Sequence, residues 1–244
     1  MNDKKEHIIA IMLSFIGGIL DIYCLMNFNL YATLHTGNII KLATCLVDKN
    51  YYMFIATFLI ILFFGVGIYI ANVIENSKKG SNIKKLFIVS IVLLIISLFV
   101  PNDAPQGELS SLKMLSAIIF GLEGAFIIHS FVSFGEFYYS ATTMTSNVNR
   151  LVTSVYKRVH DKDKNNNYGI LTYLFIFLFF MLGVAVGYLY LTSIPNFENE
   201  FMNLYKYNFL IIIPIILMMS CLFITNVIKS FRCIYTFQII NCDL

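Results

Sequence analysis

Residues 34–42 read LHTGNIIKL, a stretch in which a histidine, a threonine, a glycine, an asparagine and a lysine interrupt very apolar sequence. The apolar runs on either side, Ile8–Leu30 and Tyr51–Val73, are each long enough to cross a hydrocarbon core of about 30 Å, which takes roughly 20 residues of helix. A polar insert between such runs must be satisfied by protein or water, because hydrocarbon offers its backbone no partner. The insert therefore decides how the chain is arranged in a membrane.

The composition of the whole chain predicts a membrane protein. Of 244 residues, 58% are hydrophobic and 13% are charged, and the mean hydropathy of +0.76 lies outside the range of soluble domains. Four more apolar runs bring the predicted spans to six; they are Leu86–Val100, which is short, Leu112–Phe134, Ile170–Thr192 and Phe209–Ile228. No small-residue cleavage site follows the first run, so we expect a retained helix rather than a signal peptide.

Several function classes find no support in the sequence. The five cysteines form no C-x-x-C pair, and there is no phosphate-binding glycine loop, nucleophile elbow or zinc signature. The basic residues lie in loops, where they orient spans rather than bind nucleic acid. We expect no metal, no cofactor and no nucleic-acid partner, and the expected partners are the lipid bilayer and a small polar or ionic solute, with a homo-oligomer left open.

The polar insert occurs twice. Ala32–Thr44 laid over Ala141–Thr153 gives six identities in thirteen positions. These pair Ala32 with Ala141, Thr33 with Thr142, Thr36 with Thr145, Asn38 with Asn147, Leu42 with Leu151 and Thr44 with Thr153. Glycine-bearing spans precede and follow both inserts. An internal repeat is therefore predicted, with an N-terminal half at 1–105, a C-terminal half at 106–230 and a tail at 231–244.

The basic residues predict the orientation of the two halves through the positive-inside rule. With six spans and inserts that do not cross, twelve basic residues lie inside and three outside. If both inserts cross, the tally falls to ten against five. The expected fold is thus an all-α membrane protein of six transmembrane helices in two inverted three-helix repeats, each with a half-helix or broken helix carrying Thr-Gly-Asn or Thr-Ser-Asn. Both termini are expected in the cytoplasm.

Each insert is predicted to form a short helix that starts near the bilayer midplane. A helix over Thr36–Val47 would rise about 18 Å, roughly half the bilayer. Thr36 or Thr145 is expected to cap its first turn, and Gly37 to let a backbone or a solute approach closely. The alternative is that the threonines and asparagines only bond helix to helix.

Two carboxylates are predicted inside the membrane, where each costs about 2.5 to 3.5 kcal/mol on insertion scales. Asp21 lies near the middle of the first span and Glu123 at a similar depth in the fourth. Each is interpreted either as a solute or proton site or as a structural group, and Lys41 or Arg150 could pair with Asp21. The candidate solute-binding residues are Asp21, Thr36, Gly37, Asn38, Lys41, Glu123, Thr145, Asn147 and Arg150.

The stretch from Gly17 to Ala43 resembles the YoaK-type family of bacterial multi-pass membrane proteins of unknown function. The resemblance rests on Gly17, Gly18 and Asp21 in the first helix, followed by the Thr-Gly-Asn triplet at 36–38. The second half matches more loosely, with Ser146 in place of the expected glycine. The resemblance implies a location in a bacterial cell membrane and no particular activity.

The leading functional hypothesis is a transporter or channel for a small polar or ionic solute, with its site near the midplane between the halves. One alternative is an intramembrane enzyme that uses Asp21, His35, His129 and Glu123 as acid and base, although it lacks an obvious nucleophile. The other is a non-catalytic assembly or sensor protein. His35 and Glu136 are expected at the mouths of the cavity.

Overall fold

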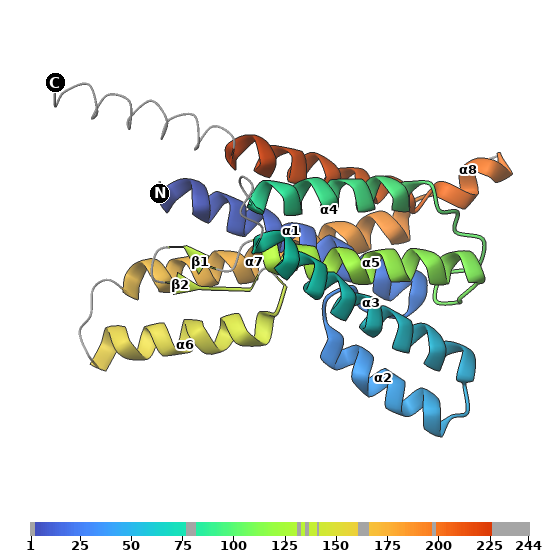
Figure 1. The fold of residues 1–244 in the computed structure, drawn as a ribbon, viewed down its shortest axis with the longest axis horizontal. Helices are drawn as coiled ribbons and strands as arrows, with labels where there is room; N and C mark the ends of the chain where they lie inside the picture. Colours follow the sequence, from blue (N-terminus) through green and yellow to red (C-terminus); the bar gives the residue numbers. More distant parts are fainter. Residues whose placement is uncertain are drawn as a thin grey trace.

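The computed structural model describes residues 3–76, 82–130, 133–134, 137–140, 142–160, 166–196 and 199–225. In this part of the chain the protein is a bundle of roughly aligned helices (Figure 1). The long helices are α1 (Asp3–Phe28), α3 (Tyr51–Glu75), α4 (Asn82–Leu98), α5 (Ser111–Ser130) and α7 (Asn166–Ser193), followed by a last helical stretch over Asn208–Thr225 that opens with the 3-10 turn η1 (Asn208–Ile211). Each of the six predicted apolar runs thus overlaps a helix, and the end of the last run lies outside the described residues.

Five of these helices are long and apolar enough to cross a membrane. They provide the candidate spans His7–Phe28, Tyr51–Glu75, Ser111–His129, Asn167–Ser193 and Asn208–Thr225. The 17-residue helix α4 coincides with the run that the sequence marks as short. The chain is therefore a multi-pass membrane protein whose apolar helices contact the bilayer.

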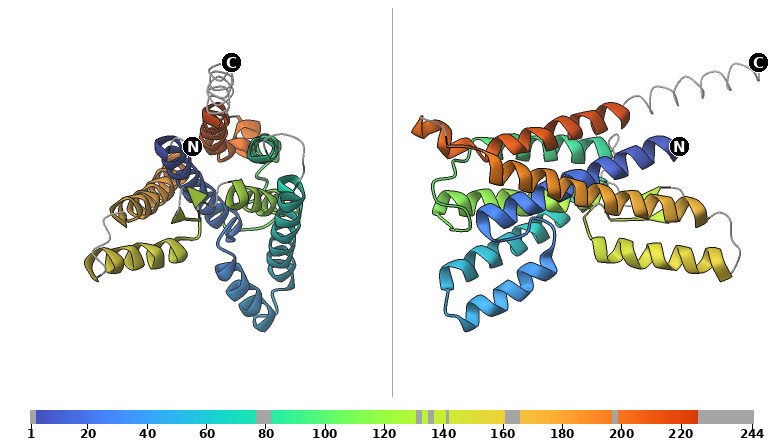
Figure 2. Two further views of the ribbon diagram at one scale, coloured as in Figure 1. Left: turned by 60° about the vertical axis from the view of Figure 1, so that its left-hand side comes forward. Right: turned by 180° about the vertical axis from the view of Figure 1, so that it is seen from behind.

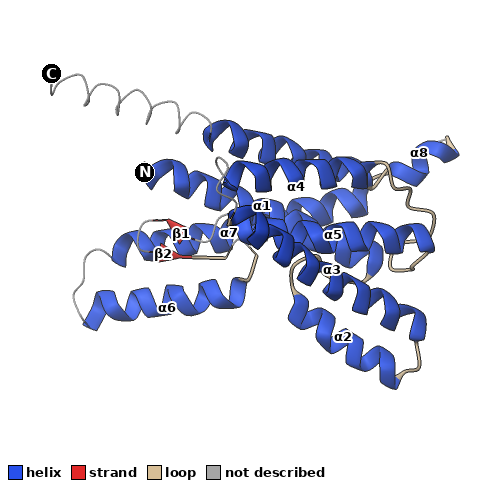
Figure 3. Cartoon of the chain, viewed as in Figure 1, coloured by secondary structure: helices blue, strands red, loops and turns tan. Residues whose placement is uncertain are grey.

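The shorter elements lie between the long helices (Figure 3). They are α2 (His35–Val47), α6 (Met144–His160), α8 (Glu200–Tyr205) and the antiparallel strands β1 (Ser133–Phe134) and β2 (Phe137–Tyr138). The predicted span Leu112–Phe134 was wrong at its end, because α5 stops at Ser130 and the following serine and phenylalanine pair in β1. Aromatic residues, here Phe134, Phe137 and Tyr138, favour extended strands.

The two short inserts form helices that do not run the length of the bundle. Helix α2 has 13 residues and α6 has 17, so at 1.5 Å per residue they extend about 20 and 26 Å. In Figure 1 both begin near the middle of the molecule and run toward opposite ends. The turn between α2 and α3 lies at the same end as α8, and the C-terminal end of α6 lies at the end that holds the N-terminus, as the view from behind also shows (Figure 2).

The long helices pack in two close pairs, α1 with α7 and α3 with α5. Glycines set the distance within each pair, because a β-carbon built at Gly18 would lie 2.3 Å from the Phe180 carbonyl oxygen, and one at Gly121 would lie 2.8 Å from that of Ile60. A β-carbon at Gly183 would lie 2.2 Å from the Phe15 carbonyl oxygen. Gly183 thus lies at a close contact between α1 and α7, and such approach is typical of helix pairs in membranes.

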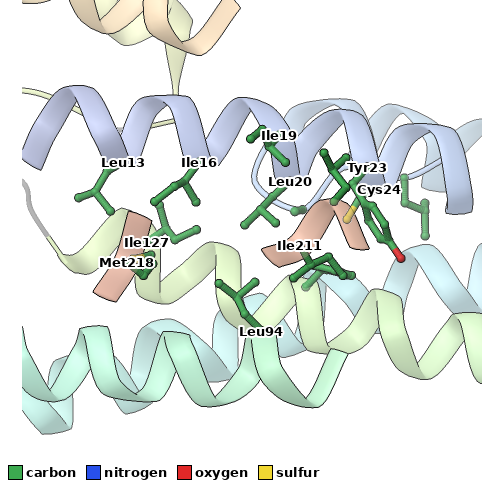
Figure 4. Close-up of a cluster of buried hydrophobic side chains, with 14 of the residues drawn as sticks. Leu13, Ile16, Ile19, Leu20, Tyr23, Cys24, Leu94, Ile127, Ile211 and Met218 are labelled. Carbon is green, nitrogen blue, oxygen red and sulfur yellow. The ribbon is translucent and has the colours of Figure 1, made fainter. Parts of the chain in front are cut away.

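Helix α1 forms the centre of the bundle (Figure 4). Its buried side chains meet residues from α3, α4, α5, α7 and the last helical stretch in one cluster, which includes Leu13, Ile16, Leu20, Tyr23, Leu94, Ile127, Ile211 and Met218. By contrast, α3 and α7 carry many exposed large apolar side chains. This distribution suits a central helix surrounded by helices that face lipid.

Candidate functional site around the two short helices

The linker Asn29–Leu34, between α1 and α2, is held by the side chain of Asn38. The Asn38 Nδ2 donates to the Tyr31 carbonyl oxygen at 2.7 Å, and the Tyr31 amide donates to Asn38 Oδ1 at 2.9 Å. The carboxamide thus offers one donor and one acceptor to a single residue, as a paired backbone would. This exchange ties the beginning of α2 to the end of α1.

The same exchange holds the second linker. Asn147 Nδ2 donates to the Ser140 carbonyl oxygen at 2.5 Å, and the Ser140 amide donates to Asn147 Oδ1 at 3.1 Å. Both asparagines are buried, and both bind the residue seven positions earlier. Asn38 and Asn147, predicted as solute contacts, are therefore placed where they position the linkers.

The glycine of the first motif lies under an aromatic ring. A β-carbon at Gly37 would come within 2.8 Å of the Tyr31 ring. In the second motif the corresponding residues are Ser146 and Ser140, so a small side chain replaces the ring where a serine replaces the glycine. The close approach at Gly37 is thus to Tyr31 of its own linker.

Asp21 in α1 holds the other end of the first linker. Its two carboxylate oxygens accept from Thr33, one from the backbone amide at 2.9 Å and one from the hydroxyl at 2.6 Å. The backbone amides of Ala32 and Leu34 also act on this carboxylate. Uncharged donors compensate Asp21, which fits the structural role that the sequence left open.

The two basic residues of the motifs have partners other than Asp21. The Lys41 Nζ donates to the Asn29 carbonyl oxygen at the end of α1. Arg150 interacts with the Tyr173 side chain of α7. Each cation thus lies on its short helix close to a long helix, and the pairing with Asp21 considered from the sequence is wrong.

Glu123 in α5 is the second buried carboxyl, and it lacks such partners. Its side chain is 0% exposed, and neither carboxylate oxygen accepts or donates a hydrogen bond. The polar group that acts on this carboxyl is the buried Ser90 hydroxyl of α4, which does not meet the geometry of a hydrogen bond to it. The next residue, Gly124, backs onto the first linker, since a β-carbon there would lie 2.4 Å from the Ala32 carbonyl oxygen.

The motif threonines are exposed rather than capping. The residue that precedes α2 in the N-cap position is Leu34, which makes no side-chain cap bond. The first-turn amides of Gly37 and Asn38 bond instead to the Leu34 carbonyl oxygen at 3.0 and 3.4 Å. The expected cap by Thr36 is therefore wrong, because the turn is closed by backbone. Thr36 and Thr145 both present their side chains at the surface of the first turn.

The exposed surface of α6 carries a polar stripe. Thr145, Asn149, Thr153 and Lys157 are exposed and follow one another at intervals of four residues, so they lie along one face of the helix. Four exposed valines run beside them, namely Val148, Val152, Val155 and Val159. In α2 the residue that corresponds to Asn149 is Ile40. Thr36 and Thr44 of α2, which correspond to Thr145 and Thr153, are also exposed, so Ile40 interrupts in α2 a polar stripe that is continuous in α6.

The remaining sequence candidates lie apart from these residues or outside the described chain. The ring of His35 packs on Phe64 of α3, with a centroid distance of 3.7 Å. His129 lies at the end of α5 and is partly buried. Glu136 lies outside the described residues. Among the residues that the structure describes, no three His, Cys, Asp or Glu side chains gather closely enough to hold a metal ion.

The sequence analysis missed two polar clusters at one end of the bundle. Lys113 is fully buried and donates to the carbonyl oxygens of Asn27, Pro105 and Glu108 at 3.3, 2.6 and 3.2 Å. Asn208 accepts from the Tyr23 hydroxyl at 2.6 Å and donates to three carbonyls at the end of α4, the shortest at 2.7 Å from Val100. The one sequence signal for these clusters is that Lys113 and Asn208 are polar residues at the start of apolar runs.

Comparison with known proteins gives one match. The model of a family described as "Protein of unknown function (DUF1275)" matches residues 9–202. No curated protein and no solved structure matches the chain. The match extends across both motifs, so the short helices and their linkers fall within the matched region.

Proposed function

The chain belongs to the DUF1275 family of proteins of unknown function, and we propose that it is a membrane transporter or channel for a small polar or ionic solute. The proposed site lies between the two short helices and the long helices that hold them. The observation that carries the proposal is the pair of matching linkers, each held by an asparagine carboxamide bonded to the residue seven positions earlier. The resemblance to YoaK-type proteins is consistent with this membership and stays a prediction.

The proposal includes two inverted repeats, which equivalent contacts in the two halves support. Gly18 of α1 meets Phe180 of α7, and Gly121 of α5 meets Ile60 of α3. Gly187 meets Ile19 and Ile22, and Gly67 meets Leu122 and Ala125. In every case the α1 and α5 residues differ by 103 in number and the α3 and α7 residues by 120.

The directions of the helices agree with an inverted arrangement. In Figure 1, α1 and α5 run in opposite directions, as do α3 and α7. The residue numbers of equivalent motif positions, such as Asn38 and Asn147, differ by 109, which is six more than the difference between α1 and α5. The segment from β1 to β2 spans six positions, 133–138, and accounts for this difference. The hairpin is thus an insertion in the second half, placed before its linker.

Short helices that end inside a membrane protein are suited to binding polar groups. Their first-turn amides carry partial positive charge, which attracts anionic groups. Thr36 and Thr145 are exposed at these turns, and Lys41 and Arg150 add positive charge on the same helices. In this arrangement Asp21, Gly37, Asn38 and Asn147 position the linkers, while the threonines and cations face the solute.

The polar stripe of α6 supports a water-filled approach to the site. Hydrocarbon cannot satisfy exposed amides and cations, so Asn149 and Lys157 on this stripe are expected to face water. The positive-inside rule places that end of α6 in the cytoplasm. We therefore propose a vestibule on the cytoplasmic side, in a bacterial cell membrane, with both termini on that side.

Flux measurements in vesicles test the proposal. Purified protein in liposomes is assayed for uptake of labelled chloride, nitrate, formate, lactate, aspartate and serine, with protein-free liposomes as the reference. We expect uptake of at least one of these solutes, reduced at least tenfold by combining Thr36→Val with Thr145→Val. The control is Thr192→Val, which removes an exposed hydroxyl bonded only to carbonyls of its own helix, at Tyr188 and Leu189. No uptake of any solute, or equal loss in the control, would overturn the proposal.

A further inference from the structure

The two buried carboxyls of the membrane region are in opposite situations. Asp21 receives two hydrogen bonds from Thr33, at 2.9 and 2.6 Å. Glu123, which is 0% exposed, receives none at either oxygen. A carboxylate without hydrogen bonds or a cation is very costly to bury, whereas a protonated carboxyl is neutral. The surroundings of Glu123 therefore suit the protonated form.

No charged side chain offsets this effect at Glu123. Apart from burial, the Ser90 hydroxyl is the one group that acts on it among the described residues. The helices that pack against α5 are α1, α3 and α4. None of the other titratable and charged groups on these helices or on α5 itself acts on Glu123. Within the described side chains these groups are His7, Asp21, Tyr23, Cys24, Tyr51, Tyr52, Tyr69, Glu75, Lys84, Lys85, Lys113 and His129. A proton is thus the cation best suited to this carboxyl.

Glu123 also lies next to a contact that depends on the first linker. A β-carbon at Gly124 would be 2.4 Å from the Ala32 carbonyl oxygen and 3.1 Å from the Thr33 Cγ2. The same Thr33 is held by Asp21. The linker therefore lies against α5 at the residue after Glu123, whereas the polar group that acts on the carboxyl itself is Ser90 of α4.

We infer that Glu123 is a proton-binding site, because it is fully buried in α5 with neither a cation nor a hydrogen bond at its carboxyl oxygens. The inference rests on the proposed transport function in one respect only, because a proton site inside the membrane region would couple solute movement to protons. In this account Asp21 holds the linker through its hydrogen bonds to Thr33 and does not exchange protons. Proton binding itself needs no solute and can be measured separately.

Carbodiimide labelling of the purified full-length protein tests this inference. Dicyclohexylcarbodiimide reacts with a protonated carboxyl in an apolar setting, where the acid O–H adds across the C=N bond. The acyl group then migrates to nitrogen, so the whole reagent is retained as an N-acylurea and nothing leaves. Peptide mass spectrometry locates the adduct.

The expected label is on Glu123 and not on Asp21, and its rate of formation falls as the pH rises, because the carbodiimide reacts with the protonated acid. Glu123→Gln abolishes the label, and Asp21→Asn does not. Gly65→Ala, whose β-carbon meets nothing within 4 Å, leaves the label on Glu123 and its rate of formation unchanged.

Other results would overturn the inference. A label on Asp21 in place of Glu123 would assign the proton to the wrong carboxyl. An unlabelled Glu123, or a rate of labelling that does not change with pH, would make it a permanently neutral structural acid. Glu123→Asp, which keeps the carboxyl, must restore the label if Glu123→Gln lowers the yield of folded protein. If labelling behaves as expected and no solute is taken up, the transport proposal fails and the proton site stands.

Discussion

The ring of Tyr31 lies so close to Gly37 that a β-carbon on the glycine would come within 2.8 Å of it. Tyr31 also exchanges two backbone hydrogen bonds with the Asn38 carboxamide. Two consecutive motif residues thus contact the same linker residue: Gly37 leaves room for the Tyr31 ring, and Asn38 hydrogen-bonds to the Tyr31 backbone. This relationship explains why a glycine and an asparagine are adjacent at the start of α2.

The contact between Tyr31 and Gly37 predicts a compensating pair of substitutions. Gly37→Ser alone should destabilise the folded protein by about 1 to 3 kcal/mol, because the added side chain meets the ring. Combining Gly37→Ser with Tyr31→Ser reproduces the residues at the second motif and should recover most of that loss. Thermal unfolding in detergent of the two single variants and the double variant gives the coupling energy. Additive effects, without coupling above about 0.5 kcal/mol, would show that the ring does not require the glycine.

The asparagine carboxamides predict a loss of stability at both motifs. Asn38→Ala leaves the Tyr31 amide and carbonyl without their partner, and an unsatisfied buried group costs about 1 to 3 kcal/mol. Asn147→Ala should act similarly through Ser140. The comparison is Asn72→Ala, since Asn72 is exposed and donates to the Ile68 carbonyl of its own helix. Melting temperatures in detergent should fall for both motif variants and stay within error for the comparison variant; equal behaviour of all three would contradict the positioning role.

The glycines at the helix contacts predict a graded series. Gly183→Ala should separate α1 from α7, because its β-carbon would lie 2.2 Å from the Phe15 carbonyl oxygen and backbone cannot give way cheaply. Gly65→Ala places its β-carbon in open space and should be neutral or slightly stabilising, since alanine favours helix over glycine by about 1 kcal/mol. Size-exclusion profiles and melting temperatures of the two variants measure the difference. A neutral Gly183→Ala would mean that the two helices are not in close contact.

Much of the helical architecture could be predicted from the sequence. Apolar run length located the long helices, and the polar insert at 34–42 located α2 to within one residue of its observed start. The side-chain roles were harder. Whether Asn38 faces a solute or its own linker depends on Tyr31, which lies seven residues away across a reversal of the chain, and spacing along one helix does not reveal such a contact.

The second motif illustrates the same limit. The replacement of glycine by Ser146 weakens a hypothesis in which a solute touches the backbone, yet its explanation is the small Ser140 at the position equivalent to Tyr31. Likewise, Lys113 is the second residue of the predicted span Leu112–Phe134, and nothing near it in the sequence indicates its partners. The folded chain buries it, because one carbonyl group from α1 and two from the loop before α5 converge on its Nζ. Convergence of distant backbone is a property of the tertiary fold.

The central claim, that the two short helices enter from opposite sides without crossing, is tested most directly by cysteine labelling in sealed cells. Single cysteines replace Lys49, His160 and Glu200 in a cysteine-free chain, and all three positions are exposed. They are treated with a membrane-impermeant maleimide before and after permeabilisation. The account predicts that Lys49→Cys reacts in sealed cells together with Glu200→Cys, while His160→Cys reacts only after permeabilisation. Labelling of Lys49→Cys on the same side as His160→Cys would mean that α2 crosses the membrane, and it would contradict the account.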